Sequence, residues 1–427
     1  MKVTGLPALD HLLRCGWPGP DGRPRTRPVR SVVIGRGLTA RARALVEEAG
    51  LSGPFAVLAD ENTAPVMGEA VADALGARLV RLLRPKAAVE TAEAVLAELA
   101  GARTVVAAGS GTLNDLAKYA AWRIGVQSCI FATAPSMNGW VTATASLARA
   151  GLKGSLPVPP PRAAFFDLDV LARAPVRLRR AGIGDALCRS SVELDLWLQH
   201  VLLGARFPAR AMALQREAEA RALAHLPGMV AGEAEAVRAL VVWLLAGSFA
   251  MLMEEGSAPA SQGEHALSHF VDVFADPHPG SLHGEQVALA TRHMLRLAAR
   301  LLARDEPPAL APLRMDEASL ARVFGPHAGA ARAFIRAKGL DDAARVAALQ
   351  KTLAARWADL RHLWRTTCLA PGRAEELLDV AGLPRSPVEL GIAEDLWARA
   401  LQWSFALRPR FGLLDLAVLA RLPVAGS

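Results

Sequence analysis

The chain has 427 residues, of which 52% are hydrophobic and 21% are charged, so it is long enough for two or three domains and can bury a large core. This composition excludes a disordered chain. The formal net charge is +8, but the arginines are spread among Asp and Glu with no basic stripe of interleaved aromatics, and we therefore predict no nucleic-acid partner.

Cysteine usage and apolar segments indicate the compartment. The four cysteines lie far apart and form no CxxC pair, which argues against a zinc ribbon or a disulfide scaffold and favours a cytoplasmic protein. The longest uncharged apolar stretch, residues 239–253, is shorter than the roughly 20 residues that a bilayer span needs. We interpret it as a buried helix and predict no membrane span. The N-terminus shows no secretory signal.

Residues 1–30 form a predicted N-terminal extension, because residues 16–29 are rich in Gly, Pro and Arg, a composition that suits a mobile or edge segment. Between residues 31 and 175, short apolar runs alternate with Ala-rich helical segments. This alternation is typical of βαβ units and predicts a mostly parallel sheet with helices on both faces. The predicted strands are 31–35, 55–60, 78–83, 104–108, 128–132 and 163–167.

The pattern changes after Pro175. Residues 176–427 show helical periodicity, broken by loops, and almost no strand pattern. The predicted fold class is therefore an α/β domain over residues 31–175 followed by an all-α domain over residues 176–427. Ligands are expected in the crevice between the two domains.

The second predicted strand ends in an acidic residue, Asp60. A carboxylate at the carboxyl end of an early strand is placed to accept hydrogen bonds from an adenosine ribose, and it would repel a 2′-phosphate. This position would favour NAD over NADP. The alternative is a solvated Asp that begins a turn.

A Gly-Ser-Gly-Thr run at residues 109–112 separates the fourth predicted strand from a predicted helix that begins at about Leu113. Glycines let the backbone approach a phosphate closely, and a helix N-terminus points N–H groups at it. The run does not follow the first strand with GxGxxG spacing, as in an ordinary Rossmann domain. We predict that it holds a pyrophosphate, with a plain tight turn as the alternative. Asp115, in the predicted first helical turn, either contacts the cofactor or caps N–H groups.

Polar clusters stand out in the helical half. His265 and His269 are four residues apart and share one helix face. His283 begins the next predicted helix, and the loop between them could fold it back against the first. Asp185 follows Gly-Ile-Gly at a predicted helix start. Imidazole and carboxylate donors suit zinc and also iron or nickel, and three protein ligands leave a position open for substrate. The alternative to a metal site is that these histidines are ordinary core or surface residues.

Six motifs, in this order, resemble those of the sn-glycerol-1-phosphate dehydrogenases, a branch of the iron-containing alcohol dehydrogenase and dehydroquinate synthase-like superfamily. They are GSGTLNDLAK, ATAPSMNGW, FFDLDVLARAP, AGIGDALCR, APASQGEHALSHF and SLHGEQVALAT. The C-terminal RPRFGLLDLAVLARL also resembles that branch. The resemblance covers residues 31–423. It implies a dehydroquinate synthase-like fold, with a dinucleotide-binding α/β domain, a helical metal- and substrate-binding domain, and the active site in the interdomain cleft.

The resemblance also implies roles for single residues. Asp185, His265 and His283 match the metal ligands, with zinc usual and nickel known in bacterial members. The positions that match the NAD(P) site are Asp60 and Asn62 on the adenosine side, Gly109, Ser110, Gly111, Thr112 and Asp115 in the phosphate loop, and Thr133 and Ser136 near the nicotinamide. His269 matches a second-sphere or phosphate-contacting position. Lys153 matches a position that faces the substrate, and its alternative is a solvated loop lysine.

The implied reaction is the interconversion of dihydroxyacetone phosphate and sn-glycerol 1-phosphate, or of a closely related phosphorylated ketone and polyol. The metal would act as a Lewis acid on the ketone oxygen while hydride arrives from the nicotinamide. A proton would reach that oxygen through water or a neighbouring hydroxyl. A role in phospholipid metabolism follows by analogy only.

Three positions depart from the family pattern. Asn138 stands where an Asp usually approaches the hydroxyl end of the substrate, and an Asn can hydrogen bond but cannot act as a base. Arg189 stands where a Lys is common, and Ser110 where a Gly is common. With Asn138, either the proton relay runs through water or the substrate differs from glycerol 1-phosphate.

Two other functions stay open. The first is a carbocycle-forming synthase of the dehydroquinate synthase type, against which the TxxDxAK pattern of the dehydrogenases argues. The second is a member that binds nucleotide without catalysis, which Asn138 would explain. We also expect a homo-oligomer, most simply a dimer, because the helical half carries Leu and Ala for packing against a second subunit.

Overall fold

The computed structural model describes residues 4–149 and 151–423. Its elements form two compact units. Unit 1 comprises Met1–Ala186 and Arg210–Ser257, and unit 2 comprises Leu187–Ala209 and Ala258–Ser427. The predicted domain boundary at residues 175/176 differs from this division.

A sheet of six parallel strands lies at the centre of unit 1, in the order β3-β10-β7-β6-β4-β5. The strands are β3 (Ser31–Gly35), β4 (Phe55–Asp60), β5 (Arg78–Leu82), β6 (Thr104–Gly109), β7 (Gln127–Ala132) and β10 (Ala163–Asp167). Every residue of β6 and β10 is buried, which is why these strands are continuous apolar runs. All six strand predictions are confirmed to within one residue at each end.

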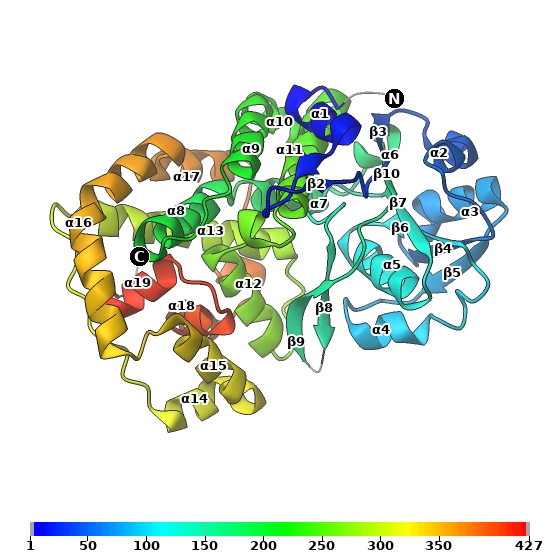
Figure 1. Ribbon diagram of the computed structural model, residues 1–427. Helices are drawn as coiled ribbons and strands as arrows, with labels where there is room; N and C mark the ends of the chain where they lie inside the picture. Colours follow the sequence, from blue (N-terminus) through cyan, green and yellow to red (C-terminus); the bar gives the residue numbers. More distant parts are fainter. Residues whose placement is uncertain (1–3, 150, 424–427) are drawn as a thin grey trace. The chain divides into compact units, whose positions relative to one another are not determined.

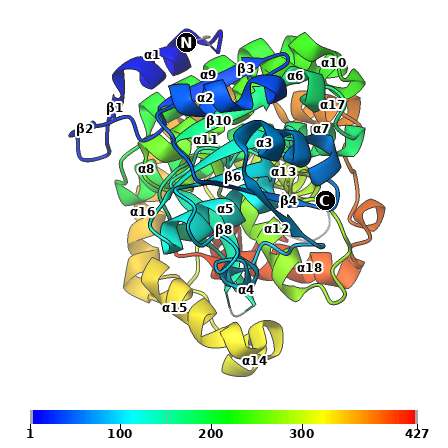
Figure 2. The ribbon, with the colours of Figure 1, turned by 90° about the vertical axis from the view of Figure 1, so that its right-hand side faces the viewer.

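Helices cover both faces of this sheet, as predicted. Helices α2 (Ala42–Glu48) and α3 (Glu69–Leu75) lie on one face, and α4 (Val89–Ala94) and α5 (Gly111–Arg123) lie on the other (Figures 1 and 2). The chain moves along the sheet in one direction from β3 to β5 and returns from β5 to β7, so right-handed crossovers place the two helix pairs on opposite faces. The connections that follow the neighbouring strands β4 and β6 run in opposite directions along the sheet. Ligands of such sheets bind outside the carboxyl ends of the strands at this point.

Two small antiparallel ribbons and a first helix were not predicted. Helix α1 (Pro7–Cys15) precedes β1 (Trp17–Pro18), which pairs with β2 (Pro24–Arg25). Strands β8 (Thr144–Arg149) and β9 (Leu152–Pro157) pair with Ala145 opposite Leu156. The segment TASLAR of β8 has a single β-branched residue, Thr144, and no aromatic residue, so its strand signal is weak.

The last helices of unit 1 are α6 (Leu168–Leu171), α7 (Val176–Ala186), α9 (Ala209–Ala222), α10 (Leu226–Ala231) and α11 (Ala234–Met253). Helix α11 contacts α6, α7 and α10. This packing adds α9–α11 to unit 1, although the sequence placed them in the helical domain. Among the described residues, α11 is the one helix long and apolar enough for a membrane span, and 83% of its apolar window is buried. The predicted buried helix at residues 239–253 is therefore confirmed.

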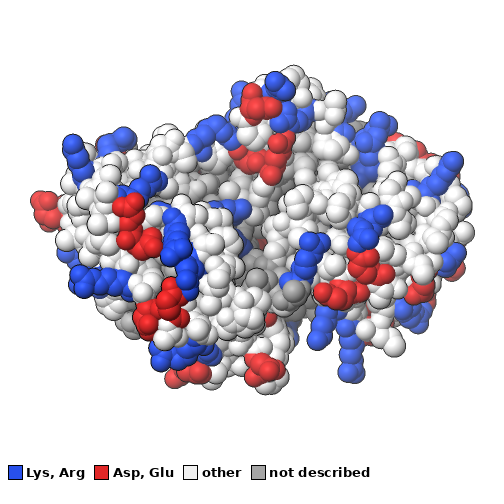
Figure 3. All heavy atoms as spheres, turned by 60° about the horizontal axis from the view of Figure 1, so that its bottom comes forward, with Lys and Arg blue, Asp and Glu red and all other residues white. Residues whose placement is uncertain are grey.

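Unit 2 is helical, and the described chain from residue 176 to residue 423 contains no strand, as predicted. Its helices are α8 (Arg189–Leu203), α12 (Gly263–Phe274), α13 (His283–Leu302), α14 (Glu317–Phe324), α15 (Ala328–Lys338), α16 (Ala343–Thr367), α17 (Pro371–Val380), α18 (Glu394–Trp403) and α19 (Leu413–Leu419). One hydrophobic core joins side chains from these helices. On the face shown in Figure 3, basic side chains are interspersed with acidic ones.

Candidate active site

The Gly-rich turn lies at the carboxyl end of β6. The strand ends at Gly109, Ser110 is the N-cap, and α5 begins at Gly111, two residues earlier than predicted. A Cβ at Gly109 would lie 2.2 Å from Leu113 Cδ1, so the turn has no room for a side chain there. The first N–H groups of α5 have no intrahelical acceptor, which suits a phosphate.

Thr133 and Ser136 lie beside this turn. The Thr133 N–H donates to the Gly109 carbonyl at 3.0 Å, and the hydroxyl oxygens of Ser110 and Ser136 lie 2.6 Å apart. Residues that the resemblance assigned to the phosphate loop and to the nicotinamide side are thus brought together at the adjacent ends of β6 and β7.

Asp60 ends β4, which neighbours β6 in the sheet with Leu58 opposite Ala107. Its Oδ1 accepts hydrogen bonds from the N–H groups of Asn62 at 3.0 Å and Thr63 at 2.8 Å. The carboxylate therefore begins a turn, which was the alternative reading of the sequence. The contacts of Asp60 and Asn62 with a ribose stay predictions.

Asp115 lies in the second turn of α5, not the first, because the helix begins early. Its Oδ1 lies 2.8 Å from Lys118 Nζ, and its Oδ2 accepts a 3.0 Å hydrogen bond from the Ser146 N–H. These contacts tie α5 to β8. The contact of Asp115 with a cofactor stays a prediction.

Two residues of α5 to which the sequence analysis gave no role hold the loop after the ATAPSMNGW motif. Lys118, with 1% of its surface exposed, donates from Nζ to the carbonyl oxygens of Gly139 at 3.3 Å and Thr144 at 2.6 Å. Asn114 donates to the Gly139 carbonyl at 3.2 Å. The sequence shows a Lys and an Asn inside an apolar helix, which is a signal that these side chains have buried partners. It does not show which loop they bind.

This loop brings Asn138 to Asp185. The Asn138 N–H donates to Asp185 Oδ2 at 2.7 Å, and the Asn138 carbonyl accepts a hydrogen bond from Ser248 Oγ. The prediction that Asp185 lies at a helix start is wrong, since α7 ends one residue after it. The preceding glycines allow close packing instead: a Cβ at Gly182 would lie 1.9 Å from the Pro135 carbonyl oxygen.

Helices α12 and α13 of unit 2 pack together and bring two histidines side by side. His265 lies in the first turn of α12, and His283 is the first residue of α13. Their ring centroids are 5.1 Å apart. His269, one turn after His265, has its ring centroid 6.1 Å from that of His283. The loop between the helices therefore folds back as expected.

Hydrogen bonds fix the tautomer of both rings. His265 Nδ1 lies 2.8 Å from Glu264 Oε1, a carboxylate that only accepts. His283 Nδ1 lies 3.1 Å from Ser268 Oγ, whose proton is donated to Gln286 Oε1 at 2.6 Å. Both Nδ1 atoms are therefore donors, and the lone pair of each ring is on Nε2. This is the arrangement in which histidines ligate a metal.

Glu264, which was not predicted, lies against this histidine pair. It is fully buried, and its Oε1 also accepts the Gln262 N–H at 2.7 Å. Burial alone would raise the pKa of the Glu264 carboxyl, but the hydrogen bonds from His265 and Gln262 hold that pKa below its usual range. Donor atoms of Cys188, Glu264 and His265 lie within 4.8 Å of one another.

The positions of Asp185, Lys153 and Arg189, which the sequence analysis singled out, complete the description of the site. Asp185 is buried in unit 1, whereas His265 and His283 belong to unit 2, so a centre of all three is a proposal. Lys153 lies in β9 opposite Ala148, and its side chain is outside the described residues. Arg189 is buried and forms a 2.6 Å ion pair with Glu193.

The fold is similar to that of two solved structures named as dehydrogenases. The chain aligns with the crystal structure of a probable glycerol dehydrogenase from Sinorhizobium meliloti 1021 with a TM-score of 0.61 and 20% identity, over 93% of this chain and 96% of that chain. The TM-score to the NADH-dependent butanol dehydrogenase A of Thermotoga maritima is 0.56, with 13% identity over 93% and 97% of the two chains. At these identities the likeness shows the fold alone, and it confirms the predicted fold class.

Residues 33–175 match the family model described as iron-containing alcohol dehydrogenase. The chain belongs to this family of oxidoreductases, and membership implies NAD(P) and a divalent metal as cofactors. It is 33% identical to the glycerol-1-phosphate dehydrogenase [NAD(P)+] of Hyperthermus butylicus over 63% of this chain and 78% of that protein. It is 30% identical to the Thermococcus kodakarensis enzyme of the same name over 61% and 76% of the two chains.

Proposed function

We propose that the chain is a metal-dependent, NAD(P)-linked dehydrogenase that interconverts dihydroxyacetone phosphate and sn-glycerol 1-phosphate, or a closely related phosphorylated ketone and polyol. The observation that carries the proposal is the pair His265 and His283, both with Nδ1 as donor and the lone pair on Nε2. The 33% identity to a glycerol-1-phosphate dehydrogenase supports the choice of substrate.

We assign the metal to Asp185, His265 and His283. Two imidazole nitrogens and one carboxylate oxygen suit zinc, and nickel or iron also accept this set. Glu264 and Ser268 hold the two rings in the required tautomer. When bound, the metal supplies polarisation of the substrate oxygen and NAD(P)H supplies hydride.

The residues of unit 1 bind and orient the other reactant. The N–H groups at the start of α5 hold the pyrophosphate of the nucleotide, with Thr133 and Ser136 on the nicotinamide side. Asp60 gives NAD the advantage over NADP. The Asn138 amide hydrogen bonds to a substrate hydroxyl but takes no proton at neutral pH, so the proton for the reduced oxygen passes through water.

The test is NADH oxidation by zinc- or nickel-reconstituted protein with dihydroxyacetone phosphate. We expect turnover that is lost in Asp185→Ala and kept in the matched control Asp359→Ala, because Asp359 is exposed on α16. Circular dichroism of each variant establishes that it is folded. The proposal would be overturned by a folded, metal-loaded protein that binds NADH but does not oxidise it when any of the phosphorylated ketones is added. It would favour a nucleotide-binding member without catalysis or a synthase, which consumes no net NADH.

The expected assembly is a cytoplasmic homodimer. Apolar side chains such as Val380 and Val388, 55% and 61% exposed, are available in unit 2 for a second copy. Light scattering that gives the mass of a single chain would contradict the dimer.

A further inference from the structure

A lysine is buried in the third turn of α5. Lys118 has 1% of its surface exposed, and its ammonium group carries three protons that need acceptors in such a place. Four acceptor atoms surround its Nζ: the Thr144 carbonyl oxygen at 2.6 Å, Asp115 Oδ1 at 2.8 Å, Thr142 Oγ1 at 3.2 Å and the Gly139 carbonyl oxygen at 3.3 Å. The buried charge is therefore fully hydrogen bonded.

Asp115 is the one carboxylate among these four acceptors, and the backbone holds it in place. Its side chain is 14% exposed, and its Oδ2 accepts the Ser146 N–H at 3.0 Å. One ammonium proton is enough for the ion pair, so the remaining protons are donated to residues 139–144, which we name the tethered loop. Lys118 is therefore more than a counter-ion of Asp115, because it also binds the tethered loop to α5.

The Gly139 carbonyl is the first point at which the tethered loop is held. It accepts hydrogen bonds from Lys118 Nζ at 3.3 Å, from Asn114 Nδ2 at 3.2 Å and from Thr142 Oγ1 at 3.1 Å. Asn114 and Lys118 are four residues apart and share one face of α5. The chain is thus fixed to this helix one residue after Asn138.

Asn138 contacts the carboxylate that we assign to the metal. Its N–H donates to Asp185 Oδ2 at 2.7 Å, and its carbonyl accepts a hydrogen bond from Ser248 Oγ. Backbone atoms of Asn138 make both bonds, so their geometry depends on where the chain is held and not on the side chain at this position. Movement of the tethered loop away from α5 would move the donor that orients Asp185.

We propose that Lys118 is a positioning residue of the metal site. Its ammonium group holds the tethered loop against α5, and the loop in turn holds the Asn138 N–H against Asp185. The proposal rests on the proposed function, in which Asp185 is a metal ligand. Groups that orient a ligating carboxylate contribute to metal affinity, so the effect of Lys118 is measurable in zinc binding as well as in the backbone of the loop.

The first measurement is amide hydrogen exchange of peptides that cover residues 138–146, followed by mass spectrometry. Lys118→Met removes the charge and all three donors at a similar side-chain length. We expect exchange in this segment to become about 10-fold faster or more, since hydrogen bonds from a charged donor are lost. The double variant Lys118→Met/Asp115→Asn also removes the unpaired carboxylate, and its Asn keeps an oxygen for the Ser146 N–H. Faster exchange should persist in it.

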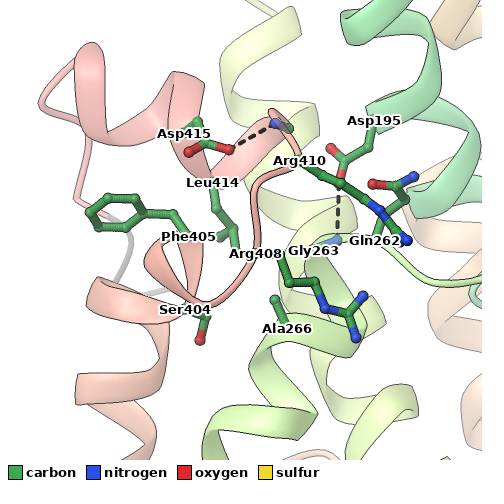
Figure 4. Close-up of a pocket in the computed structure, with 11 residues that line it drawn as sticks. Asp195, Gln262, Gly263, Ala266, Ser404, Phe405, Arg408, Arg410, Leu414 and Asp415 are labelled. Atoms are coloured by element: carbon green, nitrogen blue, oxygen red, sulfur yellow. Dashed lines mark hydrogen bonds between the residues drawn. The ribbon is translucent and has the colours of Figure 1, made fainter. Parts of the chain in front are cut away.

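Lys338→Met is the matched control for this measurement. Lys338 is a second buried lysine, and its Nζ lies 2.5 Å from Asp415 Oδ1 and 2.5 Å from the Phe405 carbonyl oxygen. Asp415 belongs to unit 2, where it lines a pocket (Figure 4). Lys338→Met should lower the free energy of unfolding, as Lys118→Met does, but it should leave exchange of residues 138–146 at the wild-type rate.

The second measurement is zinc affinity, from competition with a chelator. We expect Lys118→Met and the double variant to bind zinc about 10-fold more weakly than wild type, as when other partners that orient metal ligands are removed. Thr104→Val is the control. It removes a buried 2.9 Å hydrogen bond from Thr104 Oγ1 to the Ser52 carbonyl at the start of β6, so it destabilises the fold but should leave zinc affinity unchanged. Asp185→Ala gives the affinity without that ligand.

The outcomes separate the two proposals. Wild-type exchange of residues 138–146 in folded Lys118→Met and in the double variant overturns the positioning role. Faster exchange with wild-type zinc affinity also overturns it, provided that zinc binding depends on Asp185. Faster exchange with weaker zinc binding supports it. Equal zinc affinity in wild type and Asp185→Ala overturns the metal assignment of the proposed function, and the exchange rates then decide whether Lys118 holds the loop. Should Lys118→Met unfold, the double variant decides by the same measurements.

Discussion

The backbone N–H of Asn138 donates a 2.7 Å hydrogen bond to Oδ2 of Asp185. The side chain of residue 138 is not needed for this bond. The carboxylate assigned to the metal is therefore held in place whether residue 138 is an Asp, as is usual in the family, or the Asn of this chain.

Asn138→Ala tests this separation of roles. We expect the zinc content per chain to stay unchanged, because the N–H donor is kept. The KM for the ketone should rise about 2- to 12-fold, since a lost neutral hydrogen bond costs about 0.5–1.5 kcal/mol. Metal analysis and steady-state kinetics measure the two quantities. Loss of zinc from Asn138→Ala would show that the side chain positions Asp185 after all.

Glu264→Gln tests the group that holds His265. An amide accepts more weakly from Nδ1 than a carboxylate does, and removing such a partner of a metal-ligating histidine lowers metal affinity about 10- to 100-fold. Competition with a chelator measures the zinc affinity. The control is Glu235→Gln, since the Glu235 side chain is 74% exposed on α11. Equal zinc affinity in wild type and Glu264→Gln would contradict the assignment of His265.

Gly182→Ala tests the close packing of α7 on the loop that carries Ser136 and Asn138. The added Cβ would lie 1.9 Å from the Pro135 carbonyl oxygen, so backbone has to move. Overpacking of this kind costs about 1–3 kcal/mol, and NADH affinity should fall because Ser136 follows Pro135. Gly329→Ala is the control: its Cβ meets nothing within 4 Å inside α15, and we expect equal or higher stability. Denaturant unfolding and NADH titration check both variants.

Asp379→Asn tests an ion-pair network in unit 2. The Arg385 side chain and then Arg292 hold the pKa of the Asp379 carboxyl below its ordinary value of 3.8. A pKa that is lower in the folded state stabilises the fold above pH 3.8, and this stabilisation disappears as the pH falls through the folded value. Asp379→Asn should therefore lower the free energy of unfolding by about 1 kcal/mol or less at pH 7, and the difference should vanish well below pH 3.8.

Unfolding of both proteins at pH 7 and at pH 2.5 measures this difference. Asp395→Asn is the control, because Asp395 is 78% exposed and lies 3.7 Å from Arg399. A difference that persists at the lower pH would assign the effect of Asp379→Asn to packing and not to its charge.

The strands of the central sheet could be predicted because parallel strands are covered on both faces and become apolar runs, as in FAVLAD and AAFFD. The β8–β9 ribbon could not, since its two strands contain one β-branched residue, Thr144, and no aromatic residue, which is a weak strand signal. Helices α9–α11 have the same periodicity as those of unit 2, and only the packing of α11 on α6 and α7 assigns them to unit 1.

Local spacing predicted that His265, His269 and His283 lie together, and the structure brings their rings close. His265 and His283 lie in the first turns of their helices, and His269 follows His265 by one turn. The groups that hold the site depend on contacts between distant residues. The Asn138 N–H meets Asp185 across 47 positions of the chain, and Lys118 reaches Thr144 only after the loop has folded. Sequence periodicity carries no information about such pairs.

The chain leaves unit 1 after Ala186, returns at Arg210 and leaves again after Ser257. This threading governs the order in which a nascent chain can fold. Helix α8, with Leu194, Leu198 and Val201 in the core of unit 2, is synthesised before any of its partners α12–α19 exist. The apolar face of α8 therefore stays exposed in the nascent chain until the C-terminal half has left the ribosome, as in other incompletely synthesised domains. A chain truncated after Ser257 would contain α8 without the helices on which it packs. To produce unit 1 alone, α8 should therefore be replaced by a short linker.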